Sequence, residues 1–120
     1  MSGSFAATTK SFDIKHPTKD HMRLRYGVLE GPEHGVYIRG KLINSNVIEL
    51  PEHWTGLVDE DTITVQLTPT GKFQKLYVKE INDNKITIGN GSFFSNNTEC
   101  FYFVQGTRKD VDELEIEYEN

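Results

Sequence analysis

The chain has one cysteine, no long apolar run and no excess of basic residues, and each absence excludes a class of protein. Because Cys100 is the only cysteine in 120 residues, neither an internal disulfide nor a metal cage built on cysteine is possible. No run of about 18 apolar residues and no basic start before an apolar stretch occurs, which predicts no membrane insertion and no signal peptide. Acidic residues (18) outnumber Lys and Arg (13), so nucleic acid is not an expected partner.

The composition that remains is typical of one soluble domain with its own core. Hydrophobic residues make up 36% of the chain and charged residues 26%. Residues 1–10 are small and polar with one Phe, and they predict a flexible lead-in or a joint to a shaft. We expect residues 11–120 to form a single domain. Its charge is uneven, with 7 basic and 6 acidic residues before Asp59 but 6 and 12 from Asp59 onward.

The apolar periodicity is that of β-strands. Between Thr62 and Thr68, the apolar Ile63, Val65 and Leu67 alternate with polar side chains, which predicts one buried and one wet face. The predicted fold class is all-β: an antiparallel β-sandwich of about eight or nine short strands, with at most one short helical turn, near 51–58. Turn-forming Gly, Pro, Asn and Asp residues separate the expected strands, which are 11–14, 24–30, 36–43, 47–50, 62–68, 73–78, 85–89, 99–106 and 113–118.

The end of the chain predicts an edge strand. From Asp110 to Glu119, acidic residues alternate with Val111, Leu114, Ile116 and Tyr118. Such a strand has one apolar and one acidic face, and its charges protect an open sheet edge from unwanted pairing.

Candidates for chemistry are weak throughout the sequence. The four histidines are scattered among polar residues without metal-ligand spacing, and Asp59-Glu60-Asp61 lacks the following Gly and the distal Glu of a calcium loop. No serine lies in a Gly-x-Ser-x-Gly turn, and Cys100 in its apolar surroundings is interpreted as a buried structural thiol. We predict no catalytic residue, no metal and no cofactor, and therefore not an enzyme.

Two aromatic segments with polar neighbours are the candidates for recognition. The segment 90–98, NGSFFSNNT, sets Phe93 and Phe94 beside Asn96 and Asn97 between two expected strands. These rings either bind a ligand or pack in the core or a subunit contact. Trp54, next to His53, is the second candidate, and its neighbours Leu50, Leu57 and Val58 favour core packing. The predicted receptor-binding residues are Phe93, Phe94, Asn96, Asn97, Trp54 and His53.

Six segments in order give the chain a family resemblance: KSFDIKHP (10–17), LRYGVLEGPEHGVYIRG (24–40), VIELPEHW (47–54), VQLTPTG (65–71), LYV (76–78) and GTRKD (106–110). This order resembles the C-terminal domain of tail-fibre and related adhesive fibre proteins of tailed bacteriophages, notably T4-like phages of marine and cyanobacterial hosts, and of phage-like bacterial fibres. The resemblance implies a β-rich tip domain of a virion, assembled as a homotrimer and acting outside the cell. Its expected partner is a polysaccharide or protein of the host cell surface.

Two other functions stay open at this stage. The domain could register, cap or help fold the three chains of a fibre without touching a receptor, or it could be a polysaccharide depolymerase. Within the motifs, Arg39 and Arg108 are expected to pair with Glu30, Glu33 or Asp110 and to serve the structure.

Overall fold

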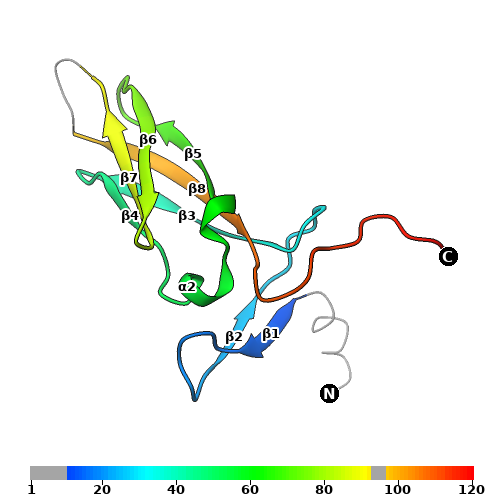
Figure 1. The fold of residues 1–120 in the computed structure, drawn as a ribbon. Coiled ribbons are helices and arrows are strands. Elements are labelled where there is room, and N and C mark those ends of the chain that lie inside the picture. The colour runs from blue at the N-terminus through cyan, green and yellow to red at the C-terminus, as the bar shows by residue number, and fades with distance from the viewer. Residues whose placement is uncertain (1–10, 93–96) are drawn as a thin grey trace.

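The computed structural model describes residues 11–92 and 97–120, which form an almost entirely β structure (Figure 1). In these residues eight strands, all antiparallel, make three small sheets, and Trp54–Leu57 form one short helical turn. The all-β prediction is therefore confirmed, together with its single helical turn.

The first sheet is a two-stranded hairpin of β1 (Phe12–Lys15) and β2 (Arg23–Tyr26). Side chains alternate along both strands, so Leu24 is buried while Arg23 and Arg25 are exposed. A hairpin of this size is marginal by itself in water and needs another element to cover its apolar side. Figure 1 shows it below the short helix α2 (Trp54–Leu57), apart from the other two sheets.

The other two sheets have three strands each and share one core. In the first, β8 (Glu99–Thr107) lies between β3 (Gly35–Ile43) and β5 (Thr64–Pro69). In the second, β7 (Lys85–Asn90) lies between β4 (Val47–Glu49) and β6 (Leu76–Asn82). A 3-10 turn at Glu60–Thr62 leads from α2 into β5.

The core follows the predicted alternation. Ile86 and Ile88 of β7 and Val104 of β8 are at most 2% exposed, and the same cluster receives side chains from β2, β3, β4 and α2. Val65 and Leu67 of β5 are partly buried against this cluster, as their alternation with polar residues predicts. The buried members are Leu24, Val36, Leu42, Ile48, Leu50, Trp54, Leu57, Val58, Ile86, Ile88, Cys100 and Val104.

The hairpin turns use the residues that the sequence marks as turn formers. Asp83 and Asn84 join β6 to β7 with φ angles of 54° and 58°, a left-handed conformation that Asn and Asp tolerate better than other side chains. Asn44, after β3, has a φ angle of 54°, and Gly71, after β5, has one of 81°. Asn84 also donates from its side-chain amide to the carbonyl oxygens of Leu50 and Pro51, which ties this turn to the start of the helical segment.

The predicted terminal strand is wrong. The last strand in the described part of the chain is β8, and the segment 111–120, which contains the expected strand 113–118, is exposed without strand structure. Alternation of apolar and acidic residues favours a strand only where a neighbour takes up the backbone N–H and C=O groups. Figure 1 shows this segment leaving the body of the domain.

Candidate functional site

The two strands that flank the predicted recognition segment, β7 and β8, have their segment-side ends at the end of the molecule away from β1 and the C-terminus (Figure 1). Phe93, Phe94 and Asn96 lie outside the described residues, whereas Asn97 is described and exposed. The flanks of the segment are fixed, because Ser92 Oγ accepts a hydrogen bond from Lys75 N at 3.1 Å. On the other flank, the carbonyl oxygen of Thr98 accepts one from Asn44 N at 2.8 Å.

A neighbouring loop presents an aromatic residue that the sequence analysis missed. Gln74 is 4% exposed, and its side-chain amide makes two 2.8 Å hydrogen bonds to the backbone of Glu99, one donated and one accepted. The amide also donates to the carbonyl oxygen of Thr70 at 3.0 Å. These bonds hold the 70–75 loop against β8, and Phe73 next to Gln74 is left 82% exposed. The sequence predicts a strand over 73–78, and this prediction gives no sign that the Phe73 ring is exposed in a loop.

Trp54 and His53 lie elsewhere, at the junction between α2 and the β1–β2 hairpin. The Trp54 side chain is 1% exposed, so core packing is confirmed for it and its ring offers no surface to a receptor. Its indole Nε1 donates to Tyr26 Oη at 3.0 Å, and Tyr26 Oη lies 2.6 Å from His53 Nε2. The structure therefore does not bring Trp54 and His53 together with Asn97.

Further rings complete this group, which we call the junction cluster: Phe12, His16, Tyr26, His53 and Trp54. Phe12 stacks on Tyr26 with centroids 5.1 Å apart, and the rings of His16 and His53 meet edge to face at 5.5 Å. His16 Nδ1 accepts hydrogen bonds from Lys19 N at 3.0 Å and Thr18 N at 3.1 Å, which orients its ring. Sequence spacing gave no sign of the pairing of His16 and His53, because 37 positions separate them.

Burial changes the titration of two members of the junction cluster. It lowers the pKa of His53, and the nearby His16 and Lys19 lower it further, while Glu52 opposes them. The pKa of Tyr26 is raised by burial, against a smaller opposite effect of the hydrogen bond from Trp54. Both rings are therefore held in their neutral forms near neutral pH, in which Tyr26 donates to His53 while accepting from Trp54.

The outer side of the β3-β8-β5 sheet carries aromatic rings beside cations and an amide. We call it the aromatic face: Tyr37, Arg39, Lys41, Gln66, Thr68, Phe101 and Phe103. The rings of Tyr37 and Phe103 stack with centroids 5.1 Å apart at 10°, and Lys41 Nζ lies 5.6 Å from the centroid of Phe101. Tyr37 is 40% exposed and Phe101 48%. A hollow of about 610 Å³ opens here, lined by Arg39, Gly40, Lys41, Gln66, Thr68, Phe101, Tyr102 and Phe103.

The register of the strands explains why these side chains meet. Phe103 of β8 lies opposite Arg39 of β3 and Gln66 of β5, and Phe101 lies opposite Lys41 and Thr68. The next residue in β8, Tyr102, faces inward opposite Gly40, where an added Cβ would lie 2.6 Å from its hydroxyl. Alternation thus divides the run Phe101-Tyr102-Phe103 between the core and the surface. The expected strand 99–106 predicts this alternation, but not which residues of other strands border the rings.

The arginine pairing expected at the end of β8 is present. Arg108 makes two hydrogen bonds to the carboxylate of Asp110, at 2.7 and 2.8 Å, and these bonds hold the pKa of Asp110 below its usual value. Glu33, another expected partner, accepts hydrogen bonds from the side chains of Gln105 at 3.3 Å and Thr107 at 3.2 Å. Both contacts stabilise the strand ends.

The described residues offer few groups for covalent or metal chemistry. Cys100 is buried, and burial raises the pKa of its thiol, which disfavours the reactive thiolate. Within residues 11–92 and 97–120, no three His, Cys, Asp or Glu side chains are grouped as metal ligands would be. The arrangement is suited to binding through rings, amides and cations.

None of the helices in the described part of the chain is long and apolar enough to cross a membrane.

Comparison with known proteins adds no further information on family or fold. No family model, no curated protein and no solved structure matches the chain. The resemblance to tail-fibre tip domains therefore stays a prediction.

Proposed function

We propose that the chain is a non-enzymatic attachment domain, the C-terminal part of a trimeric, phage-like tail fibre, and that it binds a glycan of the host cell surface. The observation that carries the binding role is the aromatic face. Three rings lie on the outer side of one sheet, and two of them, Phe101 and Phe103, line a hollow of about 610 Å³ together with two cations and an amide. Rings with convergent polar groups are typical of ligand sites.

The chemistry of the aromatic face favours an acidic sugar chain. The flat C–H side of a sugar ring packs on aromatic rings such as Phe103, while hydroxyl groups bond to amides such as Gln66. Arg39 and Lys41 add two positive charges to this face in a chain whose net charge is −5. An arginine in this position can bind a carboxylate or phosphate with two hydrogen bonds. Copies in one fibre would multiply a weak single-site affinity.

Titration of the full chain with an acidic polysaccharide tests the proposal, with polygalacturonate as the probe and neutral dextran beside it. We expect binding of the acidic chain only, and loss of that binding in Phe103→Ala with the fold retained. Tyr77→Ala is the matched control, because Tyr77 is a 53% exposed ring on β6, in the other three-stranded sheet. Absence of binding to polygalacturonate and to polysaccharide from host envelopes, with the domain folded, would refute the proposal.

The same titration separates the aromatic face from the predicted loop. Phe93→Ala with Phe94→Ala removes the two rings of the predicted recognition segment, and circular dichroism checks that the fold is retained. If this variant loses binding while Phe103→Ala keeps it, the loop carries recognition and the aromatic face does not.

The second candidate is a structural domain that registers or caps the fibre. The observation in its favour is the same row of exposed rings, since a subunit contact also covers apolar sheet faces. In that case Phe103→Ala would lower the solution mass of the assembly. If the aromatic face binds glycan instead, Phe103→Ala leaves the solution mass of the assembly unchanged and alters only the glycan titration.

A further inference from the structure

The terminal segment 111–119 has the side-chain pattern of a strand that lacks a partner in the described structure. Leu114, Ile116 and Tyr118 are 39%, 65% and 78% exposed, and they alternate with glutamates. An extended chain places these apolar side chains on one side and Glu113, Glu115 and Glu117 on the other. Figure 1 shows the segment projecting from the domain. Exposed apolar side chains in this pattern indicate a strand that is completed by another sheet.

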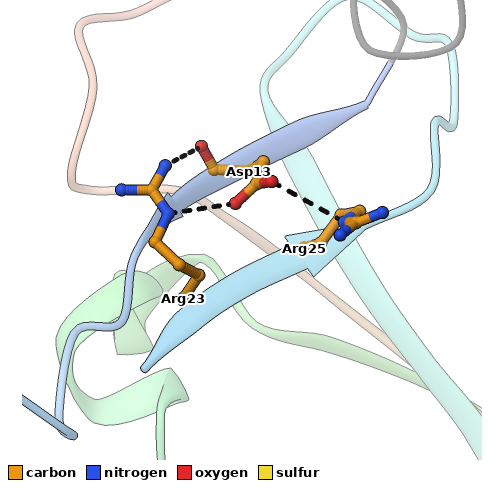
Figure 2. Close-up of polar contacts among 3 residues, drawn as sticks. All are labelled: Asp13, Arg23 and Arg25. Atoms are coloured by element: carbon orange, nitrogen blue, oxygen red, sulfur yellow. Dashed lines mark hydrogen bonds and ion pairs between the residues drawn. The ribbon is translucent and has the colours of Figure 1, made fainter. Parts of the chain in front are cut away.

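The outer side of the β1–β2 hairpin carries the opposite charge. Asp13 lies between Arg23 and Arg25, as Figure 2 shows, with Arg23 Nε 3.2 Å from one carboxylate oxygen and Arg25 Nε 3.7 Å from the other. Lys15 lies opposite Arg23 in the register and is also exposed. Two arginines therefore share one carboxylate, with a third cation next to them, and the arginine side chains remain 66% and 75% exposed. Their remaining donors are available for further acidic groups.

The edge of β2 is open to such a strand. Among the described residues β2 pairs with β1 alone, so its second edge has backbone groups without strand partners. Beside this edge is a hollow of about 370 Å³ between the end of β2 and the start of β3, lined by Tyr26 and Val28 among others and by no residue of β1. Val28 and Leu29 at this hollow are 57% and 48% exposed. An added strand would bury them and complete a three-stranded sheet.

The path of the chain carries its own terminal segment away from the hairpin (Figure 1). Lys109 N donates to the carbonyl oxygen of Leu57 at 2.8 Å, and Arg108 lies 4.1 Å from the ring centroid of Phe12 in β1. The segment therefore starts beside the hairpin, where Arg108 shares a hollow with Val28 and Leu29, and then runs outward, exposed throughout, without folding back along β2. A segment that runs outward in this way can reach the open edge of β2 in a second copy of the chain.

We propose that residues 111–119 of one copy add as a strand along β2 of a second copy. In this contact the glutamates face Arg23 and Arg25, and Leu114, Ile116 and Tyr118 face the hollow. Opposite charges on neighbouring strands fix the register, and the apolar side chains supply the buried area. Two copies can exchange their segments reciprocally in a two-fold symmetric pair. If each copy instead gives its segment to the next, the contact is heterologous and forms a ring where the rotation between copies closes. It does not depend on glycan binding.

Charge reversal on the full chain tests the contact by sedimentation or light scattering at low salt. We expect the wild type to self-associate, and Arg23→Glu with Arg25→Glu to associate at least about tenfold more weakly. Glu113→Lys, Glu115→Lys and Glu117→Lys together should weaken association similarly. Mixing the two variants, or combining all five substitutions in one chain, should restore it, because each reversed hairpin then meets a reversed segment. Restoration also shows that the variants are folded.

A backbone test separates strand addition from loose charge attraction. Ile116→Pro removes an N–H and disfavours pairing without changing the charge, and it should abolish association, whereas Ile116→Val should keep it. Glycan titration of the same variants shows whether the aromatic face still functions, so the two proposals can fail separately. A wild type that is monomeric at every concentration, or an assembly that is indifferent to charge reversal and to Ile116→Pro, would overturn the proposal.

Discussion

Two groups of aromatic rings in this domain, the junction cluster and the aromatic face, contain similar residue types but differ in burial and in hydrogen bonding. In the junction cluster, Tyr26 Oη bonds to both His53 and Trp54, and Trp54 is 1% exposed. On the aromatic face, Tyr37, Phe101 and Phe103 contact one another or a cation, and Tyr37 and Phe101 are at least 40% exposed. Rings whose polar atoms are satisfied inside the chain build the fold, whereas rings left at the surface beside cations are available for binding.

The largest expected effect is at the centre of the junction cluster. Trp54→Ala leaves a cavity in the core and should lower the free energy of unfolding by about 3–5 kcal/mol, measured by urea denaturation. Tyr37→Ala on the aromatic face is the control, with an expected loss below about 1 kcal/mol, because its ring is already in contact with water. Equal losses in the two variants would contradict the division between structural and binding rings.

A smaller loss is expected where one oxygen is removed from the junction cluster. In Tyr26→Phe the ring still packs, but the indole N–H of Trp54 and the Nε2 of His53 lose their partner. An unsatisfied buried polar group costs about 1–3 kcal/mol, which should appear in the urea midpoint. Tyr118→Phe removes a hydroxyl from a side chain that is 78% exposed, and this control should leave the midpoint unchanged.

The pH dependence of stability gives a separate test of the junction cluster, through the titration of His53. Because the folded pKa of His53 is lowered, the unfolded chain takes up the proton first as the pH falls. The contribution of His53 is therefore complete above the ordinary histidine pKa of about 6.5 and is lost as the pH falls through the lower folded value. The lowered pKa of Asp110 acts in a more acidic range, below its ordinary value of 3.8.

Unfolding curves at a series of pH values between neutral and mildly acidic check this dependence. His53→Gln should flatten it, whereas His21→Gln, at an exposed loop position, should leave it as in the wild type. A slope that persists in His53→Gln would show that another group is responsible.

The sequence predicts the fold well where one strand face is wet. In Thr64–Thr68 and in Lys85–Ile88 the more buried side chains alternate with the more exposed ones as the sequence predicts, because the pleat of a strand fixes this period. The same alternation at Glu113–Tyr118 predicts a strand that the structure does not contain. The alternation shows only that the segment could form a strand, whereas its pairing with a neighbouring strand depends on the tertiary structure.

The candidate site was less predictable than the fold. The neighbours of Phe103 on the aromatic face come from positions 37, 39 and 66, so only strand register could reveal them. Trp54 could be interpreted correctly from its apolar neighbours, but its bond to Tyr26 joins residues 28 positions apart. Local sequence patterns predict which side chains are buried, whereas the contacts between residues far apart in the sequence depend on the topology of the sheets.

The smallest expected effect concerns the stacked pair of the aromatic face. A double-mutant cycle with Tyr37→Ala and Phe103→Ala should give a coupling energy of about 0.5 kcal/mol in urea denaturation, the low end for aromatic pairs, since Tyr37 is 40% exposed. Each single variant should nevertheless lose most glycan binding. Weak coupling in stability together with strong loss of binding is the signature of rings that are held for a ligand. A coupling well above about 1.5 kcal/mol would instead make this pair part of the fold, as the rings of the junction cluster are.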